Sequence, residues 1–198
     1  MTETIKAIQR KVGVTADGII GKKTLAALAK ALGVSTSTAS TNTLPTQAQV
    51  RKGTSIFGKA GDESNLVNIK PAYPLYYCGK QVKTIRVHKL IADRVQAALK
   101  EILAYYGIEK IKQLGLDQYS GCYNYRKSTN GNSMSMHAWG IALDFAAATN
   151  AYKMKKPQAS LSKPECEMWW KIWEKHGAVS LGRQCNYDWM HLQFAKLK

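Results

Sequence analysis

The sequence predicts an α+β protein in which a small antiparallel sheet with flanking helices is preceded by a small all-α module. In the larger C-terminal part, helical apolar spacing occurs together with three short β-rich runs. A stretch rich in Ser and Thr separates that part from a short helical segment.

The composition is that of a globular protein, with 45% hydrophobic and 21% charged residues among 198. Collagen-like and fully disordered chains are therefore excluded. The chain has no run of about 18 uncharged apolar residues, and its N-terminus lacks a basic start followed by an apolar run, so we expect no membrane span and no secretory signal. Four cysteines without a Cys-x-x-Cys pair predict buried free thiols rather than a disulfide framework or a thiolate zinc site.

A linker is expected over residues 34–50. Residues 35–46 contain eight Ser or Thr, carry no charge and offer little to bury, which is typical of a flexible connection. The predicted domains are a helical module over residues 1–33 and a larger domain over residues 51–198.

Two short amphipathic helices are predicted in the first segment, on either side of a turn over residues 15–21. Their apolar residues recur at i, i+3 and i+7, and a glycine ends the second: Ile5, Ile8, Val12, Leu25, Leu28, Leu32 and Gly33. The run Asp17-Gly18-Ile19-Ile20-Gly21-Lys22-Lys23-Thr24-Leu25, preceded by Ile8-Gln9, resembles the core of the small peptidoglycan-binding modules of cell-wall hydrolases. The resemblance implies murein binding, and the alternative is a helical cap without a ligand.

In the larger domain, the clearest helix is predicted from about His88 to Tyr106, with Gly107 as its stop. A second helix is predicted to start at a capping box, Ser162-x-x-Glu165, and to end before Gly177. It carries an aromatic face, and His176 near its end is interpreted as structural. Strands are expected in the β-rich runs 122–125, 141–145 and 189–194.

Two histidines and an aspartate form the candidate metal site. A catalytic zinc takes three protein ligands from His and carboxylate side chains and leaves a fourth position for water, and His137, Asp144 and His191 would supply that set. Gly140 would let the chain turn out of the loop that holds the first ligand. Taken singly, Asp144 could instead be a solvated carboxylate at a strand end and His191 a core histidine.

A further carboxylate, Asp188, is placed to accept the proton of the attacking water. Residues three apart on a regular strand face opposite sides, so Asp188 and His191 can share one site only if Asp188 precedes the strand in a loop or bend. Asp188 alone could also be an ordinary turn residue.

The pattern Ser-x-His-x-x-Gly-x-Ala-x-Asp, formed by Ser135, His137, Gly140, Ala142 and Asp144, resembles the signature of a zinc peptidase family. This family includes D-alanyl-D-alanine carboxypeptidases and dipeptidases of vancomycin resistance and L-alanyl-D-glutamate endopeptidases of bacteriophage lysis. An acidic residue three before the last histidine is matched by Asp188. Phage members commonly have Pro before that histidine and an acid two residues after it, where this chain has Met190 and Gln193. The resemblance implies a hedgehog-like zinc peptidase fold.

The same resemblance implies two supporting residues. An arginine on a strand upstream of the signature would hold the substrate near the scissile carbonyl, and Arg126 is the candidate; the alternative is a surface arginine. Its guanidinium suits this role because it is permanently charged and binds carboxylates through two bonds. Ser135 would support the site by hydrogen bonding rather than by nucleophilic attack.

We therefore expect a phage-type endolysin that cuts the stem peptide of peptidoglycan at the L-alanyl-D-glutamate bond. It would be stored as a monomer in the host cytoplasm and would act on the cell wall after release. The net charge of +16 favours an anionic envelope surface as partner, because no nucleic-acid-binding motif accompanies it. The alternatives are a D,D-carboxypeptidase that removes terminal D-Ala and a non-catalytic zinc-containing wall-binding protein.

Overall fold

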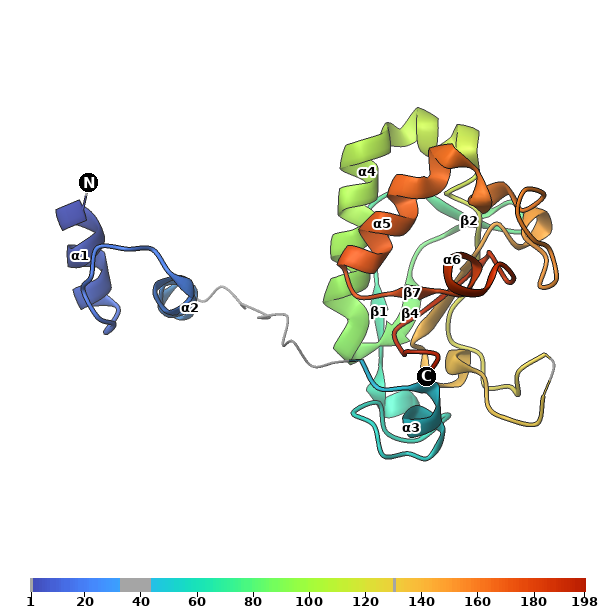
Figure 1. The fold of residues 1–198 in the computed structure, drawn as a ribbon, viewed down its shortest axis with the longest axis horizontal. Helices are drawn as coiled ribbons and strands as arrows, with labels where there is room; N and C mark the ends of the chain where they lie inside the picture. The colour runs from blue at the N-terminus through green and yellow to red at the C-terminus, as the bar shows by residue number, and fades with distance from the viewer. Residues whose placement is uncertain (1, 33–43, 130) are drawn as a thin grey trace. The chain divides into compact units, whose positions relative to one another are not determined.

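The computed structural model describes residues 2–32, 44–129 and 131–198, and the chain divides into two compact units, Met1–Thr43 and Leu44–Lys198 (Figure 1). The second unit thus begins before the predicted boundary at residue 51. Thr46 caps helix α3 (Gln47–Arg51) through a complete capping box, and Val50 is fully buried. Residues 44–50 therefore belong to the larger domain and not to the linker, whose remaining part, 34–43, lies outside the described residues.

The first unit contains the two predicted helices, α1 (Thr2–Lys11) and α2 (Lys22–Ala31). Their apolar residues are not buried as the periodicity suggested, since Leu25 is 55% and Leu32 is 73% exposed. The buried centre is polar instead: the Gln9 amide donates to Asp17 and Thr24 and accepts from the Gly18 amide. So short a hairpin has too little apolar surface for a core, and hydrogen bonds join its turn to its helices. The predicted stop at Gly33 lies outside the described residues.

The larger unit is built around a four-stranded antiparallel sheet of order β5-β6-β8-β7, which confirms the predicted α+β class. Two separate antiparallel pairs, β1 with β4 and β2 with β3, complete the strands. The bounds are β1 Leu66–Ile69, β2 Leu75–Tyr77, β3 Lys80–Val82, β4 Ile85–His88, β5 Tyr119–Gly121, β6 Ala142–Phe145, β7 Val179–Ser180 and β8 His191–Gln193.

The strand predicted over residues 122–125 is displaced. Strand β5 ends at Gly121, whose φ of +134° takes the chain out of the sheet, and residues 122–125 form an irregular segment. The backbone amide of Asn124 in this segment donates to the His137 carbonyl. The runs around β6 and β8 were placed correctly.

The first predicted helix ends at Gly107, as expected, but a second helical segment follows it directly. Helix α4 (Ala92–Leu114) follows a 3-10 turn at Lys89–Ile91, and Gly107 inside it has non-helical backbone angles, φ +67° and ψ 164°, so α4 consists of two helical segments joined at a kink. Glycine adopts a positive φ at little cost, which allows the kink at this position. Within the described residues no helix is long and apolar enough to cross a membrane.

The second predicted helix, α5 (Glu167–Lys175), begins later and without the predicted capping box. The Ser162 hydroxyl donates to the Ala159 carbonyl instead, and 3-10 turns at Ser160–Ser162 and Pro164–Cys166 precede the helix. His176, which was interpreted as structural, has its ring 2.8 Å from the Glu101 carboxylate. A last short helix, α6, covers Leu181–Cys185.

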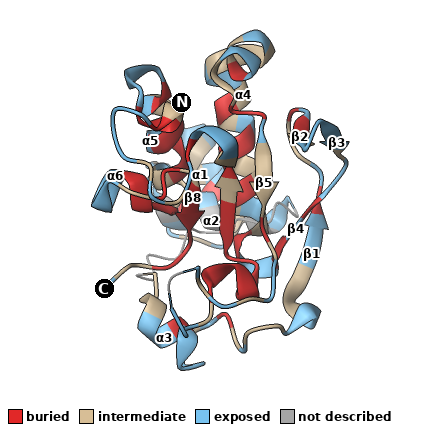
Figure 2. Cartoon of the chain, turned by 90° about the vertical axis from the view of Figure 1, so that its right-hand side faces the viewer, coloured by how far each residue is buried: buried red, intermediate tan, exposed pale blue. Residues whose placement is uncertain are grey.

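The core lies between the helices and the sheet. Helices α4 and α5 run side by side (Figure 1), and the buried rings of Trp169 and Trp173 on α5 pack against Phe145 of β6, with ring centroids 5.3 and 5.9 Å apart. Buried segments of α4, α5 and β8 lie in the middle of the unit, whereas β1 and β3 are largely exposed (Figure 2). This core fixes the two strands that carry the candidate site.

Candidate metal centre

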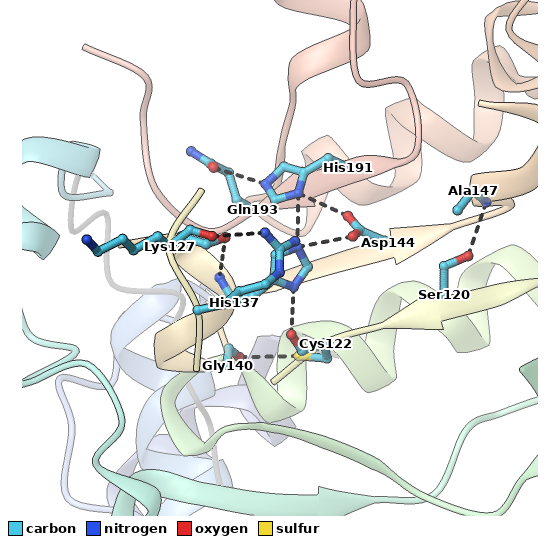
Figure 3. Close-up of polar contacts among 11 residues, drawn as sticks. Ser120, Cys122, Lys127, His137, Gly140, Asp144, Ala147, His191 and Gln193 are labelled. Atoms are coloured by element: carbon cyan, nitrogen blue, oxygen red, sulfur yellow. Dashed lines mark hydrogen bonds and ion pairs between the residues drawn. The ribbon is translucent and has the colours of Figure 1, made fainter. Parts of the chain in front are cut away.

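The three predicted ligands converge on one point (Figure 3). Asp144 on β6 and His191 on β8 are direct cross-strand partners, so their side chains lie side by side. His137 reaches them from the 3-10 turn Met136–Trp139. The His137 Nε2 atom lies 3.2 Å from Asp144 Oδ2 and 3.2 Å from His191 Nδ1, which is 3.0 Å from Asp144 Oδ1.

The turn that presents His137 is defined at both ends. The Ser135 hydroxyl accepts from the His137 amide at its start. Gly140 ends it with φ +66°, and a Cβ atom there would lie 2.7 Å from the Leu66 side chain. Only glycine combines this backbone conformation with the close approach of a neighbouring strand, as expected for Gly140.

Outer hydrogen bonds orient both histidine rings. His137 Nδ1 lies 2.6 Å from the Cys122 carbonyl oxygen, which can only accept, so this nitrogen carries the proton. Gln193 donates its amide to the Ala195 carbonyl and thereby turns its oxygen toward His191 Nε2, 3.2 Å away. In the neutral rings the inward-facing nitrogens are therefore lone-pair donors, which is how metal-ligating histidines are held.

Asp144 supplies the negative charge of the cluster. Its side chain is only 14% exposed, so it is not a solvated strand-end carboxylate. Burial opposes ionisation, but the charge and hydrogen bonds of the two histidines outweigh it and hold the pKa of Asp144 far below its usual range. Burial also opposes the charged form of His191 and by itself would lower its pKa. The hydrogen bond and the charge of Asp144 outweigh this effect, so the pKa of His191 is raised. A buried carboxylate needs a cation, which here is either a histidine proton or a metal ion.

The spacing of the three ligand atoms fits a tetrahedral zinc ion. Zinc bonds of about 2.0–2.1 Å in tetrahedral geometry separate neighbouring ligand atoms by about 3.3 Å. The two histidine nitrogens lie 3.2 Å apart, and each lies 3.0–3.2 Å from a different oxygen of the Asp144 carboxylate, so that one ligand atom from each residue lies within 4.8 Å of the other two. The same contacts also serve as ion pairs between the histidines and Asp144. The residues therefore fit a metal, and the ion itself is part of the proposal below.

Asp188 precedes β8 in a turn, as predicted from the geometry of the strand. It has φ +54°, and its carbonyl accepts from the His191 amide. The residue is 8% exposed, and among the described residues its Oδ1 atom has no hydrogen-bond partner. Burial raises the pKa of Asp188 to about 6, the nearby Asp144 charge acts in the same direction, and the histidines and Arg126 offset part of this effect.

Arg126 lies in an irregular loop, not on a strand as predicted. The loop is still held in place: the Ser135 amide donates to the Arg126 carbonyl, and the Arg126 guanidinium donates to the Lys127 carbonyl. Ser135 thus supports both Arg126 and His137 through hydrogen bonds. One pocket of about 220 Å³ contains all the predicted site residues, Arg126, Ser135, His137, Asp144, Asp188 and His191.

Among the pocket residues that were not predicted from the sequence, three make contacts that matter for the site. Gln193 orients His191, although the sequence marked it only as a departure from the family pattern. Gln47 donates to the Gln193 side-chain oxygen, and Arg51 lines the pocket. Both belong to α3, of which residues 47–50 were assigned to the linker and Arg51 to the larger domain. No local pattern connects them with their partners, which lie 83 or more positions away.

Comparison of the chain with models of known protein families, with curated proteins and with solved structures finds no significant match.

Proposed function

We propose that the chain is a zinc-dependent peptidase that hydrolyses the stem peptide of bacterial peptidoglycan. The observation that carries the proposal is the convergence of His137, Asp144 and His191, whose ligand atoms lie within 4.8 Å of one another, beside a buried carboxylate oxygen of Asp188 that has no partner among the described residues. A structural metal site would need no such carboxylate. The combination of the three-residue cluster with the Asp188 carboxylate therefore favours a catalytic site over a non-catalytic zinc-containing wall-binding protein.

A zinc ion held by the three ligands would supply Lewis-acid polarisation of the scissile carbonyl and lower the pKa of water toward about 7. Asp188 accepts the proton of the attacking water as the new C–O bond forms. It then returns the proton to the leaving amine as the C–N bond breaks. Its pKa of about 6 suits both transfers, because a general base works best when its pKa lies near the operating pH. Arg126 holds the substrate at the mouth of the pocket.

The substrate class rests on the resemblance of the Ser135–Asp144 pattern and on charge. A net charge of +16 raises the encounter rate with a polyanionic wall, and the first unit would add peptidoglycan binding. On this basis the enzyme is a phage-type endolysin that leaves the host cytoplasm to cut the L-alanyl-D-glutamate bond. The hedgehog-like zinc peptidase fold belongs to the same proposal.

Digestion of intact murein tests the reaction. We expect lysis to stop on chelation and to return with zinc, and mass spectrometry to show stem peptides released at L-alanine. Free D-alanine as the only product would instead identify a D,D-carboxypeptidase. Lysis that is insensitive to chelators would contradict the metal mechanism.

The substitution Asp188→Asn tests the base. It keeps the size of the side chain and leaves the three ligands in place, so we expect zinc binding to persist while kcat falls about 10²- to 10⁴-fold. Asp93→Asn, an exposed position on α4, makes the same chemical change outside the pocket and serves as the control. An Asp188→Asn variant that binds zinc, folds normally and still lyses walls at the wild-type rate would show that the base is wrongly assigned.

A further inference from the structure

A second arginine lies at the candidate metal centre. Arg51, the last residue of α3, lines the same pocket as Arg126 and the metal cluster. Its Nε atom donates to the Met134 carbonyl at 3.0 Å, next to Ser135, whose amide holds the Arg126 carbonyl. The two arginines are thus anchored on adjacent residues of one loop.

Neither guanidinium at the pocket forms an ion pair with another described residue. Among the described residues, no carboxylate oxygen lies within 4.0 Å of Arg51 or Arg126, whereas Arg86 and Arg183 have carboxylate partners at 2.6 and 2.8 Å. The hydroxyl side chains of Ser128, Thr129 and Ser135 line the same pocket. Two guanidinium groups without an ion-pair partner within 4.0 Å, together with hydroxyl donors, suit a carboxylate, which arginine binds through paired hydrogen bonds.

We propose that Arg51, together with Arg126, binds a free carboxylate of the substrate next to the scissile amide. This inference rests on the proposed peptidase function and specifies its substrate. In murein the D-glutamyl residue continues through its γ-carboxyl group, so the residue that carries the leaving amine keeps a free α-carboxylate. A terminal D-alanine has the same feature. The site would therefore select peptides with an α-carboxylate, and not an α-carboxamide, on the leaving side.

A matched pair of substrates tests the site: an acylated L-Ala-γ-D-Glu peptide with a free α-carboxylate, and the same peptide with an α-carboxamide. For the zinc-loaded wild type we expect kcat/KM to favour the carboxylate about 10- to 100-fold, the effect of one charged hydrogen-bond pair. Arg51→Gln is expected to lose most of that preference by slowing only the carboxylate substrate. Arg51→Lys keeps the charge but not the planar fork, and is expected to fall between the two.

Lys52→Gln is the control, because it removes the same charge from the neighbouring exposed residue, which does not line the pocket. It should behave as the wild type. Equal slowing of both substrates by Arg51→Gln, or an unchanged preference, would overturn the inference, since the first outcome indicates only a structural role for the Met134 contact.

Calorimetry on the same zinc-loaded proteins measures binding of the two peptides. This measurement tests the carboxylate site independently of the proposed reaction. Arg51-dependent binding of the carboxylate peptide without hydrolysis would support the carboxylate site and refute the peptidase. Hydrolysis without an Arg51-dependent preference between the two peptides would support the peptidase and refute the carboxylate site. Binding of neither peptide and cleavage of neither would refute both.

Discussion

The side chain of Gln193 holds a ligand of the candidate metal centre in position, and its replacement by leucine tests that function. Gln193 is 1% exposed. Its oxygen accepts from Gln47 and faces His191 Nε2 at 3.2 Å, and its amide donates to the Ala195 carbonyl at 2.6 Å. Leucine is similar in volume but can make none of these bonds, so the His191 ring loses the acceptor that selects its tautomer.

The expected effect follows from the number and burial of the lost bonds. Removing the outer hydrogen-bond partner of a metal-ligating histidine lowers metal affinity about 10- to 100-fold, which corresponds to about 1.4–2.7 kcal/mol. The Ala195 carbonyl and His191 Nε2 lose a partner in a buried setting, so the free energy of unfolding of the metal-free protein should fall by about 1–3 kcal/mol.

Zinc affinity is measured by competition with a chelating dye, and stability by denaturant unfolding. Gln47→Leu is the matched control: it removes one bond of the same network but leaves Gln193 attached to both His191 and Ala195, so zinc affinity should change less than about threefold. Wild-type affinity in Gln193→Leu, or an equal loss in both variants, would refute this account of how His191 is oriented.

Three further predictions concern other parts of the larger unit. Gly140→Ala forces a side chain into the left-handed region and to within 2.7 Å of a leucine methyl carbon, so thermal unfolding should show a loss of about 1–3 kcal/mol; wild-type stability would contradict this. Hydrogen bonds from two basic side chains at the end of α5 lower the pKa of Glu101, so the ionised carboxylate stabilises the fold. The wild type should therefore be more stable than Glu101→Gln, and this difference should reach its full size above about pH 4.5. It should vanish as the pH falls through the lowered pKa, and a constant difference in melting temperature would argue against the pair. The prediction of buried thiols holds for Cys122 and Cys166 but is wrong for Cys78 and Cys185, which are exposed. Burial raises the pKa of the Cys122 thiol, so alkylation of the folded protein should label Cys78 and Cys185 but not Cys122, and rapid labelling of all three would exclude this packing.

The ligand candidates could be identified from the sequence because each stands in a short local pattern. His137, Gly140 and Asp144 lie within eight residues, and their types already limit the chemistry. The bend at Asp188 was also predictable, because the two-residue period of a strand forbids Asp188 and His191 from sharing a face in one straight segment. The boundaries were less predictable: a second helical segment of α4 follows the predicted stop at Gly107, and the Ser162 hydroxyl donates to a preceding carbonyl instead of capping α5.

The amino-acid sequence by itself determined the α+β class, two of the central strands and the candidate ligands, because these depend on side-chain type and on spacing within about ten residues. Only the tertiary structure decided that Asp144 pairs with His191 across β6 and β8, that Gln193 orients the ligand, and that α3 brings Gln47 and Arg51 to the pocket. Such contacts join segments up to 146 positions apart. Their geometry is set by strand register and by the packing of the whole core, and no local pattern of residues encodes either.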